Sequence, residues 1–367
     1  MLRVTKAILH VFDFETGTKY FSQSTLDLED RQTKSYVQRR LRKITANPES
    51  RHGEFAPTSN FAGGLQEYAH GDVEFVEFSH QIAQWFWEEL RRADDVEQCD
   101  LLVADYIDTD AGQALASAAA DDEDAQAEAF EGEGRRLFAI VLLPRKQAFI
   151  HDVNGSANEI LRQDATLPSP TQKVDSYAVI DLDTGAIDFH DHDRSVAGEG
   201  KFIIPELFLE CSSEASSHEV IGEVTVIVQD LAEEYGLEPA VEVSRAKAAV
   251  AEAAEVEEVV DPIKVGKRIF EERPEIQEKY EAQVASRELP EEVPVKRGVA
   301  NRIAKNHKIR TDTGIEISFP SNLTERPGYL EFSHESDGRI TISITSRNSF
   351  WEVCKLRIFL NIIVYLG

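Results

Sequence analysis

The chain has 367 residues, three cysteines and a formal net charge of −28, with 42% hydrophobic and 29% charged residues. These proportions predict a globular protein large enough for two domains, without a disulfide framework and without an apolar run long enough to span a bilayer. The negative charge excludes a uniformly basic nucleic-acid-binding domain, so contact with a polyanion would have to come from local basic patches.

The first 240 residues predict an α+β domain. Residues 2–14 alternate like a strand, and because no charged-then-apolar leader opens the chain, we do not expect secretion. Helices are predicted over 27–46 and 74–92, each with one apolar stripe. The aromatic side chains of 74–92 are typical of a core-facing helix rather than of a cofactor site.

Short apolar segments bounded by turn residues follow. Strands are predicted over 100–106, 136–143, 147–153, 177–182 and 186–190. The turn at 144–146 predicts a hairpin between the second and third of these strands, and the turn at 183–185 predicts one between the last two. The pattern indicates an antiparallel sheet flanked by helices.

An acidic segment, 107–134, separates the first two of these strands. It holds nine acidic residues and no lysine or arginine, with alanine and glycine filling much of the rest. This composition predicts a disordered or weakly helical loop inserted in a hairpin, with a solubilising role as its plainest reading.

The remaining chain predicts a linker and a smaller α+β domain. A helix is expected over 217–235, and the predicted regions are the N-terminal domain 1–240, a helical linker 241–261, a C-terminal domain 262–350 and an apolar tail 351–367. Within 262–350 we expect helices over 262–286, a basic segment over 296–310 and strands over 315–319, 328–333 and 339–345. The apolar tail would be prone to aggregation if it were exposed, so we expect it to be buried as a terminal strand or in a partner interface.

Residues typical of catalysis are few and poorly arranged. There is no phosphate-binding glycine motif and no GxSxG, HExxH or CxxC pattern, and Gly63-Gly64 reads as a turn. His190 and His192, with His151 on a neighbouring strand, could serve a metal-dependent hydrolase or nuclease. However, the alternation of His and Asp over 190–193 would split the ligands between two faces. We therefore expect no enzyme, cofactor or metal site.

Two basic segments stand out against the acidic background. The helix at 31–46 has its apolar stripe on one side, which would leave its bases on the other, and segment 296–310 allows a short helix of the same kind. The plain reading of 31–46 is a solvated helix whose bases balance acidic neighbours such as Glu29, Asp30 and Glu49. Neither interleaves aromatic residues for base stacking, so sequence-tolerant contacts to phosphates are expected. The predicted DNA contacts are Arg31, Lys34, Arg39, Arg40, Arg42 and Lys43 in the first segment, and Lys296, Arg297, Arg302, Lys305, Lys308 and Arg310 in the second.

The order of several segments resembles the bacterial nucleoid-associated protein family named for its thirty-seven-kilodalton size. The matching stretches are KAILHVFDFETG, FSQSTLDLED, YVQRRLRKI, FVEFSHQIAQWFWEEL, CDLLVADY, RLFAIVLLPRKQAFIHDV, ILRQDATLPSPTQKVDSYAVIDLDTG and KIRTDTGIEISFP. The resemblance covers about residues 3–345. It implies an α+β N-terminal domain, a smaller C-terminal domain, and nucleoid association with DNA binding, and it brings no catalytic residues.

Two functions follow as hypotheses, both set in the cytoplasm at the nucleoid and neither involving a membrane. The first is a non-catalytic protein that binds double-stranded DNA through the basic patches. The second is an acidic module that docks on DNA-handling proteins or mimics DNA. The sequence leaves a homodimer open.

Overall fold

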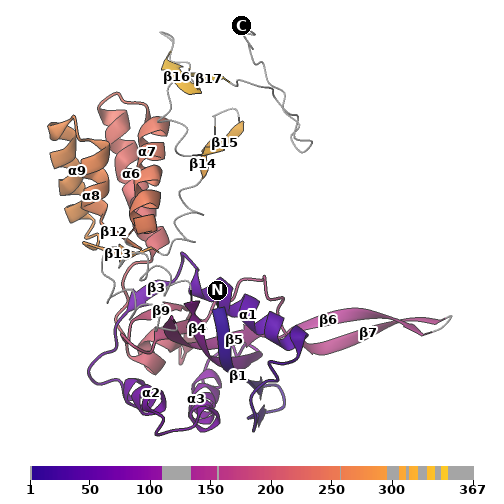
Figure 1. Ribbon diagram of the computed structural model, residues 1–367. Helices are drawn as coiled ribbons and strands as arrows, with labels where there is room; N and C mark the ends of the chain where they lie inside the picture. The colour runs from indigo at the N-terminus through magenta and orange to yellow at the C-terminus, as the bar shows by residue number, and fades with distance from the viewer. Residues whose placement is uncertain are drawn as a thin grey trace, which may run out of the picture. The chain divides into compact units, whose positions relative to one another are not determined.

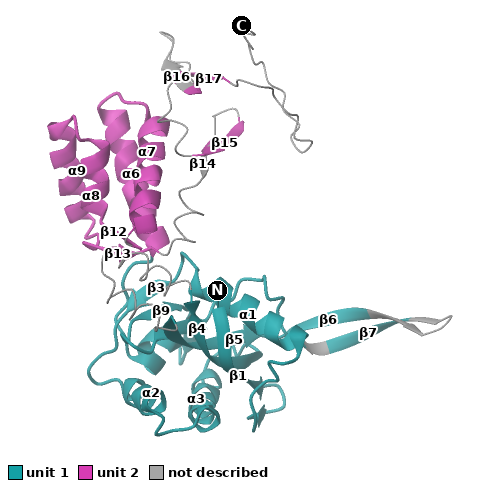
Figure 2. Ribbon diagram, in the orientation of Figure 1, with its two compact units in different colours: residues 1–216 teal, residues 217–367 magenta. Residues whose placement is uncertain are grey.

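The structure is a computed structural model that describes residues 2–109, 134–154, 157–256, 258–295, 306–310, 314–320, 329–334 and 340–345 (Figure 1). It divides into two compact units, residues 1–216 and 217–367 (Figure 2). The sequence placed this division later, near 240–262. The helices over 217–256 pack on each other and on the following helices, and for that reason they belong to the second unit.

The first unit is built on a seven-stranded sheet in the order β2-β1-β4-β5-β8-β9-β3, in which every pairing is antiparallel. The strands are β1 (Leu2–Asp13), β2 (Thr18–Tyr20), β3 (Arg51–Gly53), β4 (Cys99–Asp108), β5 (Arg135–Pro144), β8 (Tyr177–Asp181) and β9 (Ile187–His190). A helix-flanked antiparallel sheet confirms the predicted α+β class, and the predicted β8–β9 hairpin is also confirmed.

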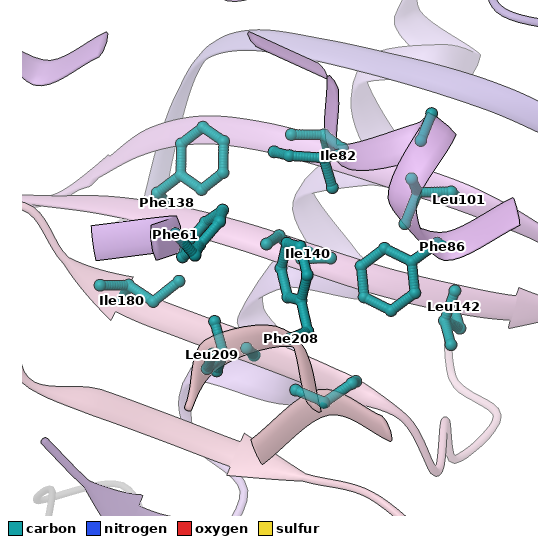
Figure 3. Close-up of a cluster of buried hydrophobic side chains, with 14 of the residues drawn as sticks. Phe61, Ile82, Phe86, Leu101, Phe138, Ile140, Leu142, Ile180, Phe208 and Leu209 are labelled. Atoms are coloured by element: carbon teal, nitrogen blue, oxygen red, sulfur yellow. The ribbon is translucent and has the colours of Figure 1, made fainter. Parts of the chain in front are cut away.

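Helices cover both faces of this sheet. The helices α2 (Asn60–His70) and α3 (Phe75–Leu90) and the π-helix η1 (Ile203–Leu209) bury aromatic and aliphatic side chains against one face (Figure 3). Helix α1 (Arg31–Thr45) covers the other face. The predicted turn at Gly63-Gly64 is wrong, because both glycines lie inside α2. A Cβ atom on Gly64 would lie 3.2 Å from the ring of Phe78, so the glycine lets α2 and α3 pack closely without a shift of that ring.

The predicted hairpin around 144–146 is also wrong. Strand β5 is already paired with β4 on one side and with β8 on the other, so the next strand cannot turn back onto it. The chain instead leaves the sheet as a separate ribbon, in which β6 (Lys146–Asn154) pairs with β7 (Ala157–Thr166). Figure 1 shows this ribbon projecting away from the sheet, beside α1. A smaller ribbon, β10 (Asp193–Val196) and β11 (Glu199–Phe202), follows β9.

The acidic segment lies where the sequence placed it, between two paired strands. The β4–β5 ladder runs as far as Asp108 opposite Arg135, so the chain leaves and re-enters the sheet at neighbouring positions. Residues 110–133 lie outside the described part of the chain, as does the apolar tail 351–367.

The second unit contains the helices α6 (Ser217–Glu234), α7 (Pro239–Val256), α8 (Pro262–Ile269) and α9 (Pro274–Ser286). Most of the helical linker predicted over 241–261 is α7, which buries Val243, Ala246 and Val250 against the other helices. Asp261 caps α8 with Pro262 in its first turn, as predicted. Short strand pairs complete the described part: β12 (Val259–Val260) with β13 (Val293–Pro294), β14 (Asn306–Arg310) with β15 (Glu316–Pro320), and β16 (Leu330–His334) with β17 (Ile340–Ile344).

Candidate nucleic-acid interface

Local sequence fixes both the start of α1 and the side that it turns to solvent. Asp30 accepts hydrogen bonds from the backbone N–H of Thr33 at 2.8 Å and from its hydroxyl at 2.7 Å, which caps the N-terminus. The apolar stripe of Val37, Leu41 and Ile44 is buried against the sheet. Cations in the last turn suit the negative end of the helix dipole. The side of α1 opposite its buried stripe is therefore exposed.

That exposed side carries cations that have no acidic partner among the described residues. Arg31, Lys34, Arg39, Arg42 and Lys43 are all exposed. In the described residues, no carboxylate lies within ion-pair distance of the first four. The Lys43 ammonium donates to the carbonyl oxygen of Thr171. In a chain with a net charge of −28, this side of α1 is a local cationic surface. We call these five residues the α1 cationic face.

Of the acidic residues nearest in sequence, Asp30 and Glu49 are engaged elsewhere, and Glu29 is exposed without an ion pair to α1 in the described chain. Glu49 lies 2.8 Å from the ammonium of Lys173, and Asp30 caps the helix backbone. The plain reading of the basic helix, in which such neighbours balance its charge, has no ion pair to support it in the described chain. The positive potential of the α1 cationic face is therefore available to an external anion.

Arg40 is an exception among the predicted contacts. Its side chain is fully buried, which makes the expectation that all six bases face outward wrong at this position. Its guanidinium donates to the carbonyl oxygens of Gln172 at 2.7 Å, Pro168 at 3.1 Å and Ser169 at 2.6 Å, and it lies 5.9 Å from the Tyr36 ring. Arg40 therefore binds the segment that follows β7 to α1 and cannot reach a phosphate.

The second basic segment lies mostly outside the described residues. Lys296, Arg297, Arg302 and Lys305 fall there, so their positions stay predictions. Residues 306–310 form strand β14 and not a helix, with Lys308 opposite Ser318 and Arg310 opposite Glu316.

The histidines considered for a hydrolase do not converge. Strand β6, which carries His151, pairs with β7 and not with β9, so the expectation that His151 neighbours the 190–193 cluster is wrong. The His190 ring stacks on Tyr177, and His192 lies 3.5 Å from Glu97. Within the described ranges, no group of three His, Cys, Asp or Glu side chains could hold a metal ion.

Asp191 is fully occupied by other contacts. Its carboxylate accepts from the Arg194 guanidinium at 2.8 Å, from the Ser176 hydroxyl at 2.7 Å and from the backbone N–H of Ile204 at 2.8 Å. This buried network ties the loop after β9 to the start of η1 and leaves no oxygen for a ligand.

The two described thiols are poor nucleophiles. Burial raises the pKa of Cys99 to about 12 and that of Cys211 to about 11. At neutral pH both thiols stay protonated, and only the thiolate is reactive.

The sequence analysis missed one surface, the β6–β7 ribbon. Phe149, Ile150, Ile160 and Leu161 are all exposed on it. The signal was present as two pairs of consecutive bulky residues, which place apolar side chains on both faces of a strand. It was hidden because 147–153 was expected to pair within the sheet and no strand was expected over 157–166.

The profile of the nucleoid-associated protein YejK family matches residues 8–348. The chain belongs to that family. The resemblance seen in the sequence is thereby confirmed, and the YejK family ties this chain to the nucleoid. No curated protein matches the chain. Among the described residues, no helix is both long and apolar enough to cross a bilayer.

Proposed function

We propose that this protein binds double-stranded DNA at the bacterial nucleoid, in the cytoplasm, without catalysing a reaction. The observation that carries the proposal is the α1 cationic face, whose four arginine and lysine side chains at 31, 34, 39 and 42 have no carboxylate partner in the described chain. Cations of this kind bind phosphates and release condensed counterions from the duplex. Because such contacts do not reach base edges, binding is expected to be sequence-tolerant.

The family match supports this role, because it places the chain among nucleoid-associated proteins. The raised thiol pKa values and the fully occupied carboxylate of Asp191 support the non-catalytic part. The segment 296–310 stays a predicted second contact, with Arg302, Lys305 and Lys308 as its central bases.

The deciding experiment measures duplex affinity against salt concentration for the wild type and for Arg31→Gln/Arg39→Gln/Arg42→Gln. The slope of log K against log salt changes by about 0.9 for each phosphate that the protein no longer neutralises, so we expect the triple variant to be shallower by about 2 to 3 and weaker at low salt. A matched control is Arg91→Gln/Arg92→Gln/Arg268→Gln, which removes the same charge from arginines already paired with glutamates. Equal slopes for the two triple variants would reject α1 as the contact.

The second basic segment is tested in the same assay. Replacing Arg302, Lys305 and Lys308 with alanine should lower the affinity and flatten the salt dependence if the segment contacts phosphates. Wild-type affinity and slope in this variant would remove the segment from the proposed interface and leave α1 as the sole tested contact.

A second candidate function is an acidic module that docks on DNA-handling proteins or mimics DNA. Helix α6 favours it, because its 18 residues contain five acidic side chains and no lysine or arginine. Three of those acids, Glu223, Asp230 and Glu234, already pair with Arg287 or Lys279, which weakens this surface. Partners that stay bound to the full chain after nuclease treatment would favour this function, and partners lost on nuclease treatment would favour DNA binding.

A further inference from the structure

The segment that follows β7, residues 168–172, is fixed to α1 through its backbone. Tyr36, Arg40 and Lys43 lie at i, i+4 and i+7, which is one stripe along the helix. These three side chains donate hydrogen bonds to the carbonyl oxygens of Pro168, Ser169, Thr171 and Gln172. Because α1 holds nearly every carbonyl group of residues 168–172, we call them the α1-bound segment.

The sequence of the α1-bound segment also restricts its own backbone. Residues 169–172 form a turn, in which the backbone N–H of Gln172 donates to the carbonyl oxygen of Ser169 at 2.8 Å. Pro170 occupies the second position of this turn, where its fixed φ is favourable. A segment held in this way has little conformational entropy left to lose when its side chains contact a ligand.

Two exposed hydroxyl groups of the α1-bound segment lie beside the α1 cationic face. Ser169 and Thr171 are both exposed, and their hydroxyl oxygens are 3.1 Å apart. Among the described residues, each of these hydroxyl groups has only the other as a hydrogen-bond partner. The carbonyl oxygen of Thr171 accepts from the ammonium of Lys43, so Thr171 directly contacts a member of the α1 cationic face.

The charges around this pair of hydroxyl groups favour an anion. The ammonium of Lys43 has three donors, and its bond to Thr171 uses one of them. The carboxylates of Glu49 and Asp175 lie 2.8 Å and 3.6 Å from the ammonium of Lys173, which offsets their repulsion of a phosphate. Serine and threonine hydroxyl groups are common donors to the phosphates of a duplex.

We propose that Ser169 and Thr171 are further phosphate contacts of the duplex-binding surface, and that Arg40 is the positioning residue that holds them beside Lys43. The inference rests on the proposed function and adds contacts to the same surface. Hydroxyl groups carry no charge, so they add affinity without releasing further counterions from the duplex. The cations of α1 attract the duplex, and the two hydroxyl groups fix where it lies.

Duplex affinity against salt concentration, measured on the full chain, tests the two contacts. Ser169→Ala/Thr171→Val removes both hydroxyl groups at exposed positions, so the fold should tolerate it. We expect an affinity about tenfold lower at every salt concentration, which corresponds to about 1.4 kcal/mol for two hydrogen bonds, with the wild-type slope. Thr16→Val/Thr18→Val removes another exposed pair of bonded hydroxyl groups, 2.7 Å apart at the β1–β2 turn, and should bind like the wild type.

Wild-type affinity in Ser169→Ala/Thr171→Val would overturn the inference and leave the α1 contacts in place. A shallower salt slope in this variant would also overturn it, because neutral groups do not change the number of released counterions. A wild type that does not bind the duplex at low salt would instead reject the proposed function itself.

Arg40→Lys tests the positioning role, because an ammonium keeps the charge but lacks the planar fork of donors that reaches three carbonyl oxygens. Measured below its melting temperature, this variant should bind more weakly with an unchanged salt slope. In Arg40→Lys/Ser169→Ala/Thr171→Val the affinity should equal that of the hydroxyl variant, because a residue that acts through the hydroxyl groups has no effect once they are gone. Wild-type affinity in Arg40→Lys, or additive losses in the combined variant, would overturn the positioning role.

Discussion

Neighbouring arginines of α1 have opposite roles. Arg39 is exposed and has no carboxylate partner in the described chain, whereas Arg40 is buried and donates to three carbonyl oxygens. The difference arises because one residue step rotates a helix by 100°, which turns Arg40 toward the sheet side beside Leu41. A run of basic residues in a sequence can therefore contain both exposed charges and a buried arginine that hydrogen-bonds a distant segment of the backbone.

Replacing Arg40 with alanine should destabilise the first unit by about 3 kcal/mol, because three carbonyl oxygens lose a charged donor in a buried setting. For a unit of this size, the melting temperature should fall by roughly 10 °C. Arg39→Ala serves as the control, since an exposed substitution changes stability by less than about 0.5 kcal/mol. Calorimetry of the two variants checks the contrast, and equal melting temperatures would contradict the assigned role of Arg40.

His10 should make stability depend on pH. Burial and the nearby His80 lower the pKa of His10 to about 4, and its Nδ1 accepts from the backbone N–H of Ser22 at 3.2 Å. The pKa in the unfolded chain is about 6.5, so the folded state favours the neutral ring. The stabilisation is complete above pH 6.5 and is lost as the pH falls toward 4, by up to about 3 kcal/mol.

Urea unfolding at pH 7, 5.5 and 4.5 measures this effect. The wild type should lose more stability over that range than His10→Asn, whose amide oxygen can accept the Ser22 hydrogen bond without titrating. The two proteins differ only at this position, so the difference between their pH profiles isolates His10. Parallel pH profiles for the two proteins would show that His10 does not titrate in this range.

At the scale of residues, the sequence pattern predicted which side chains of α1 are exposed better than it predicted their hydrogen-bond partners. The apolar stripe of α1 correctly separated Val37, Leu41 and Ile44 from the exposed bases. It could not identify Arg40 as buried, because the acceptors of Arg40 lie 128 to 132 residues further along the chain. Such contacts depend on the tertiary path of the backbone, and no local pattern carries that information.

At the scale of elements, close helix packing in the second unit depends on one glycine. A Cβ atom on Gly266 of α8 would lie 2.1 Å from the ring of Tyr280 on α9. That ring is fully buried, and its hydroxyl donates to the carbonyl oxygen of Pro262 at 2.9 Å, so it cannot move aside freely.

Gly266→Ala should therefore destabilise the helical unit, although alanine is the better helix former by about 1 kcal/mol. Overpacking of a filled core costs about 1–3 kcal/mol and outweighs that gain. Gly222→Ala on α6 is the control, because a Cβ atom at this position would have nothing within 4 Å, and the substitution should be neutral or stabilising. Thermal unfolding followed by circular dichroism distinguishes the two, and a stabilised Gly266→Ala would refute the packing argument.

Element types followed from the sequence more reliably than their pairing. The strands β1, β4, β5, β8 and β9 and the helices α1, α3 and α6 all lie within or close to their predicted ranges. The pairing of β6 was wrong, because a short turn after β5 suggests a hairpin only when the edge of β5 is free. Helix α2 was missed, since its Gly63-Gly64 pair is typical of turns and its packing role appears only in three dimensions.

At the scale of the whole molecule, the net charge of −28 opposes any approach to DNA, and much of the acid is concentrated in one segment. Residues 110–133 contain eight acidic residues and no lysine or arginine. The last register pair before this segment is Asp108 with Arg135, and Thr109 and Gly134 are the next residues on the two sides, so a two-residue turn after them could join β4 to β5 without moving either strand.

Replacing residues 110–133 with Asn-Gly should tighten duplex binding several-fold at low salt, because fewer negative charges repel the duplex. The gain should fade at physiological salt, where the Debye length is about 8 Å. Fluorescence anisotropy with a labelled duplex at 20 mM and 150 mM salt checks both parts of the prediction. Unchanged affinity at low salt would show that the segment has no electrostatic influence on the interface.

The contacts of Arg40 also set an order of events during biosynthesis. The carbonyl oxygens of residues 168, 169 and 172 are translated some 130 residues after the guanidinium that binds them. At bacterial elongation rates this interval is on the order of ten seconds. Throughout it, the Arg40 guanidinium lacks the carbonyl oxygens that it binds in the folded unit. The hydrogen bonds that join α1 to the segment after β7 therefore cannot form until the β6–β7 ribbon has been synthesised.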